Sequence, residues 1–541
     1  MADANWWQTG TIYQIYPRSF ADSNGDGIGD LAGITSRLDY LASLPVDAIW
    51  LSPFYPSPMA DFGYDVADYC GVHPLFGTLE DFDALTTAAH ARGIKVIVDW
   101  VPCHCSDQHP WFIEAKASRD NPRRDWFVWR DPAPGGGSPN NWLSCFEGVG
   151  PAWTFDEASG QYYLHSFLPE QPDLNWENPE LRAAMHDTLR FWMDRGVDGF
   201  RIDVTHRLGK DPQLRDNPPG VVADTRLALL EGYRADAVAA AARMDENWPS
   251  THDRLREIRA VADEYNARVL IGEVYLLDQG ELVKYVATGD ELHLAHNFRF
   301  VLQPWSAARF RDVVDEWHAL APTTAWPDWL LENHDHNRVA SRYGDDDASQ
   351  ARARLGLMMV LTLRGTPFLY QGQELALPDG DVPADRVVDV AGRDPERCPM
   401  PWQPPSQAGP GAGFTTGEPW LPVLPGAESL NAQSQDNDPR SALWLTRRLL
   451  GLRRDFAELT TGDYQPLDAG PDVYAYLRCK DRGRLLVVLN FGTKPTRFAL
   501  AAVAGAAGGQ LLLSTDPHRG TGPVSDSVEL GSTEGVMIAL T

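Results

Sequence analysis

Short apolar runs alternate with longer amphipathic segments through the first part of the chain. The apolar runs include Ala48–Leu51 and Lys95–Val101, and the amphipathic segments include Leu31–Leu44 and Leu79–Arg92. Apolar runs bounded by turn residues are typical of strands buried on both faces, and apolar residues three and four positions apart are typical of helices. The alternation therefore predicts a parallel sheet covered by helices.

The same alternation continues to about residue 370 and brings the expected strands to eight. The other six are predicted at Thr11–Tyr16, Val197–Ile202, Arg268–Gly272, Ala295–Phe300, Trp329–Asn333 and Pro367–Tyr370. Helices are expected at Pro179–Arg195 and in the long region from residue 203 to Asn266. Eight strands with helices between them predict the α/β class and a (β/α)8 TIM barrel.

Two irregular stretches and an alternating C-terminal part interrupt this pattern. About 70 residues rich in Pro, Gly and Asn separate the third strand from the next helix, too many for a simple loop. After a Leu-rich helix at Ser441–Leu459, short alternating strands predict a small antiparallel β domain. We expect barrel residues 1–103, an inserted B subdomain at 104–176, barrel residues 177–460 with an irregular insertion at about 376–438, and a C-terminal β-sandwich domain at 461–541.

Charge and composition restrict the partners of this 541-residue chain. A formal net charge of −28 and a pI of about 4.8 disfavour nucleic acid and anionic membrane surfaces as partners. We see no run of roughly 18 apolar residues and no basic and apolar N-terminal leader, so we expect a cytoplasmic protein without a membrane partner. Six cysteines are too few for a disulfide framework. A monomer or a homodimer is expected.

Three predicted strands end in a carboxylate. They are Asp203 in Asp-Gly-Phe-Arg-Ile-Asp, Glu273 in Ile-Gly-Glu-Val and Asp335 in Glu-Asn-His-Asp. Cleavage of a glycoside needs one group to attack the sugar, one to handle the leaving group's proton and one to stabilise positive charge. Any one of these residues alone could be a structural ion-pair partner, but the three in this order predict a glycosidase site.

The residues around these carboxylates predict their protonation. Arg201 lies two positions before Asp203 and should point to the same side of the strand, where its charge favours an ionised Asp203. Glu273 follows the apolar run Val269–Ile271, so partial burial and neighbouring carboxylates should raise its pKa. An ionised carboxylate suits the group that attacks the sugar, and a carboxyl with a raised pKa suits the acid.

A separate loop carries oxygen ligands at every second position. Glycines let the segment from residue 22 to residue 30 curl so that these oxygens converge, which suits a hard cation such as Ca2+. The expected ligands are Asp22, Asn24, Asp26, Asp30 and the Ile28 carbonyl. The loop differs from an EF-hand, because its twelfth position is Gly33 instead of Glu, and the alternative is a plain turn of Asx and Gly residues.

Taken together, these motifs resemble glycoside hydrolase family 13, the α-amylase superfamily, and within it the oligo-1,6-glucosidase and α-glucosidase branch. The resemblance extends over almost the whole chain. It rests on the three carboxylate segments and on Tyr13–Phe20, Asp61–Asp65, Asp99–His104 and the Gln-Pro-Asp-Leu-Asn marker at Gln171–Asn175. It implies the same barrel, B subdomain and C-terminal β domain, and a structural Ca2+ in the loop. It also implies Asp203 as the nucleophile, Glu273 as the general acid and then base, and Asp335 as the transition-state stabiliser.

The resemblance also implies a set of sugar-binding residues. His104 and His334 would hydrogen-bond sugar hydroxyls, Tyr64 would stack on the ring, and Asp61 would bind a distant hydroxyl. Arg397 would pair with Asp61, with Arg393 as a second arginine four residues earlier. Phe146 and Phe167 are the candidates for the pocket walls. Either aromatic residue could equally be core.

The sequence departs from the family where Asn-His-Thr is usual and Cys103-His104-Cys105 stands. Cys145 and Cys398 would also lie near the pocket. Four thiols could indicate a zinc or redox site, but their spacing is not a zinc signature, and buried cysteine often serves as a small apolar residue. Both interpretations stay open at this point.

These observations predict a retaining, exo-acting α-glucosidase that releases glucose from short α-glucosides of the maltose or isomaltose type, with some transglycosylation. Two clues to linkage disagree: Val204 after the nucleophile is associated with α-1,6 cleavage, whereas Val274-Tyr275 resembles α-1,4 enzymes. The alternative is a sucrose isomerase or trehalose synthase-like transferase. A non-catalytic binding protein of the same fold is a third possibility, although such chains usually lack the carboxylates.

Overall fold

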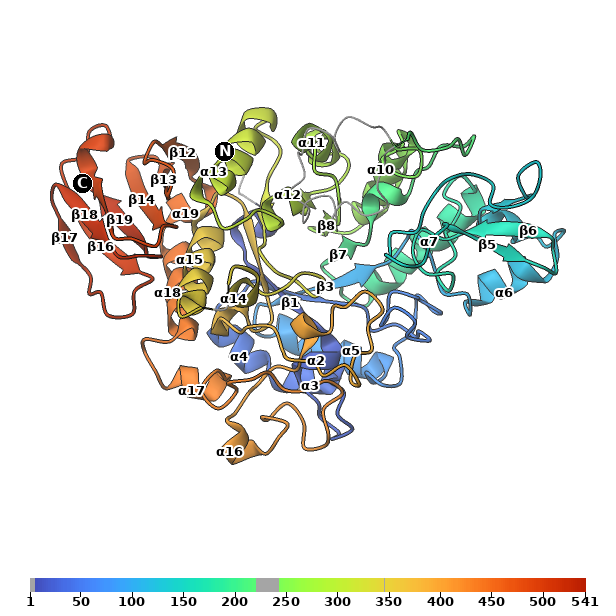
Figure 1. The fold of residues 1–541 in the computed structure, drawn as a ribbon, viewed down its shortest axis with the longest axis horizontal. Helices are drawn as coiled ribbons and strands as arrows, with labels where there is room; N and C mark the ends of the chain where they lie inside the picture. Colours follow the sequence, from blue (N-terminus) through green and yellow to red (C-terminus); the bar gives the residue numbers. More distant parts are fainter. Residues whose placement is uncertain (1–4, 220–242, 345) are drawn as a thin grey trace.

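The computed structural model describes residues 5–219, 243–344 and 346–541, and it confirms the predicted barrel (Figure 1). Eight parallel strands form one sheet in the order β10-β11-β1-β2-β3-β7-β8-β9. They are β1 (Ile12–Ile15), β2 (Ala48–Leu51), β3 (Lys95–Trp100), β7 (Gly199–Ile202), β8 (Val269–Gly272), β9 (Leu294–Ala295), β10 (Asp328–Trp329) and β11 (Thr366–Tyr370).

The barrel is nearly closed, and side chains connect its two end strands. β9 and β10 stand at opposite ends of the strand order. His296, just after β9, lies with its Nδ1 2.8 Å from Oδ2 of Asp328 in β10, and both side chains are fully buried. This side-chain contact connects β9 to β10, which are not neighbours in the hydrogen-bonded strand order of the described sheet.

Two predicted strands are shorter than expected. The run Ala295–Phe300 contains only the end of β9, because Asn297 caps a new helix, α12 (Phe298–Val301), by accepting a hydrogen bond from the N–H of Phe300. The run Trp329–Asn333 contains only the end of β10. Both prediction errors come from apolar residues that continue past the strand into the loop.

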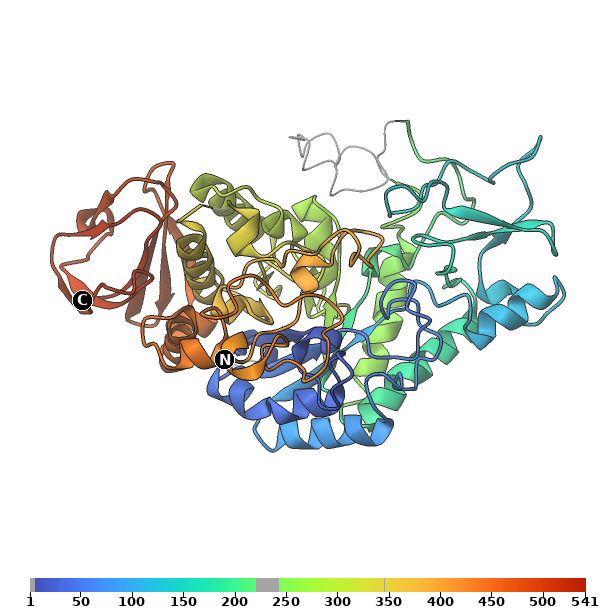
Figure 2. The same ribbon diagram turned by 60° about the horizontal axis from the view of Figure 1, so that its bottom comes forward.

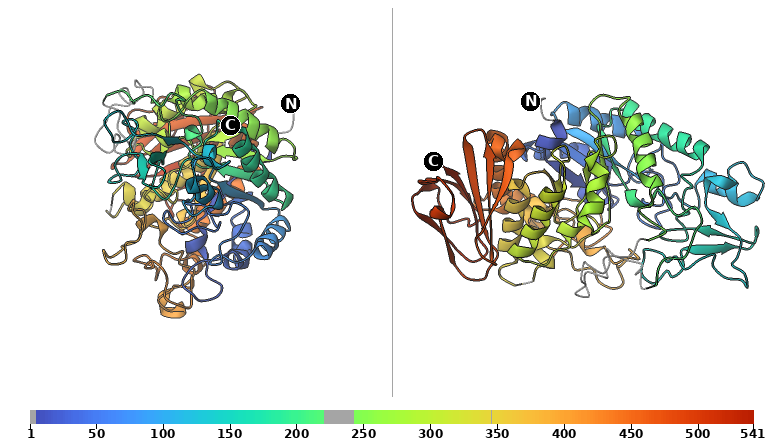
Figure 3. Two further views of the ribbon diagram at one scale, coloured as in Figure 1. Left: turned by 90° about the vertical axis from the view of Figure 1, so that its right-hand side faces the viewer. Right: turned by 90° about the horizontal axis from the view of Figure 1, so that it is seen from above.

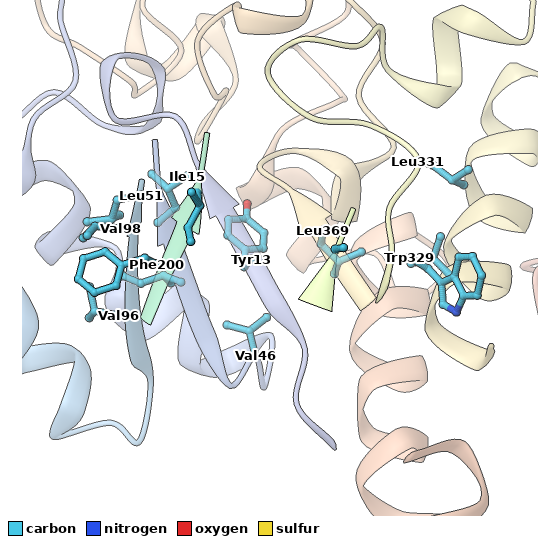
Figure 4. Packing of buried hydrophobic residues seen from close by; sticks show 14 of the residues in the cluster. Tyr13, Ile15, Val46, Leu51, Val96, Val98, Phe200, Trp329, Leu331 and Leu369 are labelled. Carbon is cyan, nitrogen blue, oxygen red and sulfur yellow. The ribbon is translucent and has the colours of Figure 1, made fainter. Parts of the chain in front are cut away.

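Alternation along the strands separates two apolar clusters. Ile12, Trp50 and Ile97 belong to a small cluster inside the barrel, whereas their sequence neighbours pack in the large cluster between strands and helices. Figure 4 shows members of the large cluster from several strands, including Val98 and Phe200. In β1 and β3 the inward-facing positions are therefore apolar at the start, at Ile12 and Ile97, and polar toward the C-terminal end, at Gln14 and Asp99.

Helices cover the outside of the barrel, and none of those described is long and apolar enough to cross a membrane. The predicted helix Leu31–Leu44 is divided at Arg37, and only part of the region from 203 to 266 is helical; its residues 220–242 lie outside the described residues. The main helices are α3 (Leu31–Ser36), α4 (Leu38–Ser43), α5 (Leu79–His90), α7 (Pro179–Asp194), α10 (Ser250–Ala262), α11 (Gln279–Ala287), α13 (Ala307–Leu320), α15 (Ser349–Thr362) and α18 (Ala442–Asp455).

The smaller sheets lie at opposite ends of the molecule, one after β3 and two in the C-terminal part (Figures 2 and 3). After β3 comes helix α6 (Pro110–Ala117) and a three-stranded sheet of β4 (Trp129–Arg130), β6 (Gln161–Leu164) and β5 (Trp153–Asp156). The C-terminal part has an antiparallel sheet of β12 (Asp463–Leu467), β13 (Val473–Lys480), β14 (Gly483–Asn490), β19 (Gly535–Leu540), β16 (Gly509–Ser514) and β17 (Gly522–Val524), with β15 (Thr496–Ala499) and β18 (Ser527–Leu530) paired separately. The predicted domain limits stay predictions.

Candidate active site

The three predicted catalytic carboxylates meet in one pocket beyond the C-terminal ends of the barrel strands. Asp203 and Glu273 follow β7 and β8 at inward-facing positions, and Asp335 comes from the loop after β10. The pocket has about 710 Å³ of empty space including its mouth, and it is lined by Asp61, Tyr64, His104, Cys145, Phe146, Phe167, Asp203, Val204, His206, Arg207, Glu273, Tyr275, Asp335 and Arg393.

Arg201 lies beneath the pocket and joins two of its carboxylates. Its Nη1 lies 2.7 Å from Oδ1 of Asp203, and its Nη2 lies 2.8 Å from Oε1 of Glu273. Asp99, at the inward-facing position near the end of β3, accepts a third contact of 2.8 Å from Nη1. Arg201 is completely buried, so its charge acts on these carboxylates without screening by water.

The protonation of Asp203 differs from the expectation. Burial and the charge of Glu273 raise its pKa well above its usual range, and Arg201 opposes them only in part. Asp203 and Glu273 both contact Arg201 and lie close enough that the charge of Glu273 disfavours the ionised form of Asp203. Burial likewise raises the pKa of Asp99 to about 6 against the lowering effect of Arg201.

The residue after Asp203 has an unusual backbone that contributes to the site. Val204 has a φ of +36°, which a β-branched residue rarely adopts. In this conformation its N–H donates to Oε2 of Glu273 at 2.9 Å, and the N–H of Thr205 donates to the backbone oxygen of Glu273 at the same distance. The strained turn therefore ties the end of β7 to the end of β8.

Tyr64 and His334 form a stacked pair at the side of the pocket. Their rings lie 5.5 Å apart at 8°, and the Tyr64 hydroxyl is 2.5 Å from Nε2 of His334. Gln14 of β1 donates to the other ring nitrogen at 2.8 Å. Burial lowers the pKa of His334 well below its usual range, so the ring is neutral and lies behind Tyr64, outside the pocket lining.

Arg393, and not Arg397, pairs with Asp61. Arg393 Nη2 lies 2.5 Å from Oδ1 of Asp61, and its Nη1 lies 3.0 Å from Asp335. Arg397 instead lies 2.8 Å from Asp335 and donates through Nε to the His334 carbonyl. The predicted pairing of Arg397 was therefore wrong, because spacing alone does not decide which of two arginines in one short segment faces the pocket.

Asp389 holds the two arginines together and was not identified from the sequence. Its Oδ1 lies 2.7 Å from Arg393 and 3.4 Å from Arg397, and its Oδ2 accepts the N–H and Nε of Arg393. Burial opposes its charge, but the contacts with Arg393 lower the pKa of Asp389 to about 2. Asp389 is therefore ionised at neutral pH, where it offsets the repulsion between the two guanidinium groups.

Glu396, which lies between Arg393 and Arg397 in the chain, gives a test of the buried charges. It is 3% exposed, and burial together with Asp379 raises the pKa of Glu396 from 4.5 to about 8. A carboxyl whose pKa is higher in the folded chain stabilises the fold fully below about pH 4.5 and loses that contribution as the pH rises toward 8. We expect Glu396→Gln to lose less stability than the parent chain between pH 5 and pH 8, measured by thermal unfolding. Parallel curves would contradict the raised pKa.

The other predicted wall residues lie where the resemblance placed them. Phe146 and Phe167 line the pocket with ring centroids 5.4 Å apart, and His104 lies 5.2 Å from Phe167. Gln171 joins His104 to Asp61 through contacts of 3.1 and 3.0 Å. His206 and Arg207 also line the pocket but were not predicted as site residues; no motif pointed to them before the fold was known.

The cysteine cluster has the geometry of a metal site but contains a lysine. Ligand atoms of Cys103, His104 and Asp173 lie within 4.8 Å of one another. Lys210 Nζ lies 2.9 Å from Asp173 and 3.9 Å from the Cys103 sulfur, so an ammonium group already neutralises the carboxylate. Burial raises the pKa of the Cys103 thiol to about 12, which disfavours the thiolate that zinc requires. The local chemistry favours the apolar interpretation over a zinc site.

The loop predicted to bind Ca2+ is curled by its own side chains. Oδ1 of Asp22 accepts the N–H groups of residues 24 and 25, Oδ1 of Asn24 accepts that of Asp26, and Oδ1 of Asp26 accepts that of Ile28. The side chain of Asp30 accepts hydrogen bonds from Ser23 and caps helix α3. The donor set is composed of oxygens, as Ca2+ prefers, although backbone donors already contact several of them.

Comparison with known proteins supports the same group of enzymes. Residues 14–462 match the family described as "Alpha amylase, catalytic domain", and residues 460–534 match a domain of unknown function, DUF3459. The chain is 40% identical over 509 residues to a protein named probable alpha-glucosidase of Rhizobium meliloti, covering 90% of each. It is 37% identical over 537 residues to an oligo-1,6-glucosidase of Parageobacillus thermoglucosidasius, covering 92% of each.

Solved structures similar to this chain include enzymes described by other activities. One is an alpha-glucosyl transfer enzyme, XgtA, with 39% identity and a TM-score of 0.90 over all of both chains. Another is the trehalulose synthase MutB from Pseudomonas mesoacidophila MX-45, with 35% identity and a TM-score of 0.89 over all of both chains. Both structures match this chain over the barrel and over the smaller sheets.

Proposed function

Because the chain belongs to glycoside hydrolase family 13, that of the alpha-amylase catalytic domain, and is a glycoside hydrolase, we propose that it is a retaining, exo-acting α-glucosidase. Its substrates in this proposal are short α-glucosides of the maltose or isomaltose type, and its product is glucose from the non-reducing end. The names of the relatives support the glucosidase activity, and the geometry of the pocket supports the mode of cleavage.

The observation that carries the proposal is the ion pair of Asp61 with Arg393 in the pocket wall. The pair lies in the same pocket as Asp203, Glu273 and Asp335, and Asp335 itself contacts Arg393 at 3.0 Å. Charged groups at this position offer hydrogen bonds to the hydroxyls of a terminal sugar. A pocket whose wall contains this ion pair should bind one terminal glucosyl unit better than an internal segment of a long glucan.

In the first chemical step, Glu273 acts as the general acid. It gives a proton to the glycosidic oxygen while ionised Asp203, 2.7 Å from Arg201, attacks the anomeric carbon. The bond to the leaving group breaks, and an ester to Asp203 forms. Asp335 stabilises the positive charge on the sugar. Asp203 and Glu273 both contact the Arg201 guanidinium, at 2.7 and 2.8 Å, which keeps the two carboxyl groups close to each other and favours retention over inversion.

The second step regenerates the free pocket. Glu273, now ionised, takes a proton from water, and the water oxygen attacks the anomeric carbon and releases Asp203. A sugar hydroxyl in place of water would give a transfer product. The likeness to the alpha-glucosyl transfer enzyme supports some transglycosylation.

A second candidate is an isomerase or transferase of the sucrose isomerase or trehalose synthase type. The likeness to solved structures of a trehalulose synthase and an isomaltulose synthase favours it. These proteins are 33–35% identical to this chain, lower than the 40% of the first glucosidase relative. The two residues that gave conflicting indications of linkage, Val204 and Tyr275, both line the pocket.

The experiment that tests the proposal is a product profile with maltose, isomaltose, sucrose and soluble starch. Glucose from maltose or isomaltose, in the α form at first release, would support a retaining α-glucosidase and identify its linkage. New disaccharides from sucrose or maltose would support the isomerase. Internal cleavage of starch without action on maltose would contradict exo action.

We further propose that residues 22–30 bind a structural Ca2+, with Asp22, Asn24, Asp26, the Ile28 carbonyl and Asp30 as candidate ligands. The oxygen donor set supports it, and the bound ion would stabilise the folded state by mass action. A chelator is expected to lower the melting temperature of the parent chain, and Asp26→Ala should remove this response without changing kcat. An equal response of both proteins would contradict the proposed site.

A further inference from the structure

Four arginines gather in a cleft between the barrel and the C-terminal sheet. Arg354 comes from α15, Arg440 from the turn just before α18, Arg448 from the middle of α18, and Arg519 from the loop after β16. The cleft has about 370 Å³ of empty space including its mouth. Among its described lining residues Asp516 is the one acid, in a chain whose net charge is −28. The local charge is therefore opposite to that of the whole molecule.

Two of these arginines lack a carboxylate partner. Arg519 pairs with Glu534 at 2.7 Å and Arg440 with Asp438 at 3.4 Å. Within the described part of the chain, no ion pair involves Arg354 or Arg448; both donate to carbonyl groups instead. Their positive charges are therefore not neutralised by direct contact.

Backbone contacts hold these two guanidinium groups in place. Arg354 donates through Nε to the carbonyl of Thr515 at 2.8 Å and through Nη1 to that of Arg440 at 3.1 Å. Arg448 donates through Nη2 to the carbonyl of Leu512 at 3.3 Å. Each arginine thus reaches from a barrel helix to the C-terminal part or to the start of α18. A guanidinium fixed in this way loses little freedom when it binds a ligand.

The N-terminus of α18 adds to the positive potential. Its 14 residues begin after Ser441, whose side chain caps the helix by accepting the N–H of Trp444, and both Ser441 and Leu445 line the cleft. The first turn of a helix carries partial positive charge that favours anions. Arginine forks from three chain segments and a helix terminus are the chemistry that recognises a phosphate group.

We propose that this cleft binds a phosphate-type oxyanion, held by Arg354 and Arg448 of the barrel and Arg519 of the C-terminal part. The site is separate from the catalytic pocket, and no lining residue is shared between the two. A bound oxyanion bridges residues of both parts of the molecule. It therefore stabilises their association.

The test is thermal unfolding and calorimetric titration of the full chain with pyrophosphate and with orthophosphate, against sodium chloride of equal ionic strength. Arg448→Gln is the main variant, because Arg448 is exposed and its loss should leave the fold intact. Arg354→Gln is the second variant, and Arg482→Gln is the matched control. Arg482 is an exposed arginine in the turn between β13 and β14, so its substitution removes the same charge outside the cleft.

We expect pyrophosphate to raise the melting temperature of the parent chain and of Arg482→Gln beyond the effect of chloride. Binding should weaken about tenfold in Arg448→Gln, as the loss of a charged hydrogen bond implies. An equal response of all variants, or no response beyond chloride in the parent chain, would overturn the proposal. An effect of pyrophosphate without one of orthophosphate would still support the site and would assign it to a diphosphate-sized ligand.

Discussion

Asp203→Asn is expected to lower glucose release from maltose or isomaltose by roughly 10⁴-fold or more, because an amide cannot form the glycosyl ester. The substitution keeps the shape of the side chain and an oxygen for Arg201, whose Nη1 lies 2.7 Å away. Loss of a buried negative charge leaves Arg201 with Asp99 and Glu273 as partners. The measurement is steady-state glucose release, with thermal unfolding as the check on folding.

Glu273→Gln separates the two roles when the substrate carries an activated aryl leaving group. Such a leaving group departs without a proton, so the variant should still form the glycosyl enzyme, seen as a burst of the aryl alcohol followed by slow turnover. Asp203→Asn should show no burst. A burst in Asp203→Asn would contradict the assignment of Asp203 as nucleophile. So would an activity of this variant on maltose of about a tenth of that of the parent chain.

Arg393→Gln is expected to reduce kcat/KM by roughly 10²–10³-fold. It removes the 2.5 Å contact with Asp61 and the 3.0 Å contact with Asp335, and it leaves Asp61 buried with Gln171 as its remaining side-chain partner. An uncompensated buried carboxylate costs several kcal/mol, so the Asp61 side chain should move from its position in the pocket wall. The measurement is kcat and KM for maltose over a range of pH.

Matched variants decide whether this effect belongs to the pocket. Arg386 lies earlier in the same segment and pairs with exposed Glu418. The variant Arg386→Gln should therefore leave both kcat and KM unchanged. Asp389→Asn should reproduce part of the Arg393→Gln effect, because Asp389 holds Arg393 at 2.7 Å without lining the pocket. Equal kinetics of Arg393→Gln and the parent chain would refute the role given to the ion pair with Asp61.

The sequence predicted the barrel because its strands are strongly apolar and lie between helices with clear periodicity. It also predicted the three carboxylates, since residues at strand ends share one edge of a parallel barrel. The short strands β9 and β10 were predicted too long, because apolar runs such as Ala295–Phe300 continue into a capped helix. Pattern identifies apolar runs, but the end of a strand depends on the cap that follows it.

The parts of the site that sequence could not predict depend on distances between segments. Arg393 and Arg397 lie four residues apart, and only the packing of the segment from 389 to 397 decides which one reaches Asp61. The raised pKa of Asp203 is similar: the expected lowering by Arg201 was correct in sign, but burial and Glu273 outweigh it. Spacing along the chain predicts neither the arginine that pairs with Asp61 nor the net direction of the pKa shift of Asp203.

The pairing of β1 with β11 has a consequence for the order in which the protein is made. Ile12 lies beside Phe368, and Gln14 of the same strand supports His334. A ribosome releases the chain from its N-terminus, so the first strand must wait, with one edge unpaired, until more than two thirds of the chain has emerged. The sugar pocket is completed later still, when Arg393 and Arg397 leave the exit tunnel. A nascent chain that ends before Arg393 thus lacks the ion-pair partner of Asp61, and the unpaired edge of β1 is a site of possible mispairing until β11 is made.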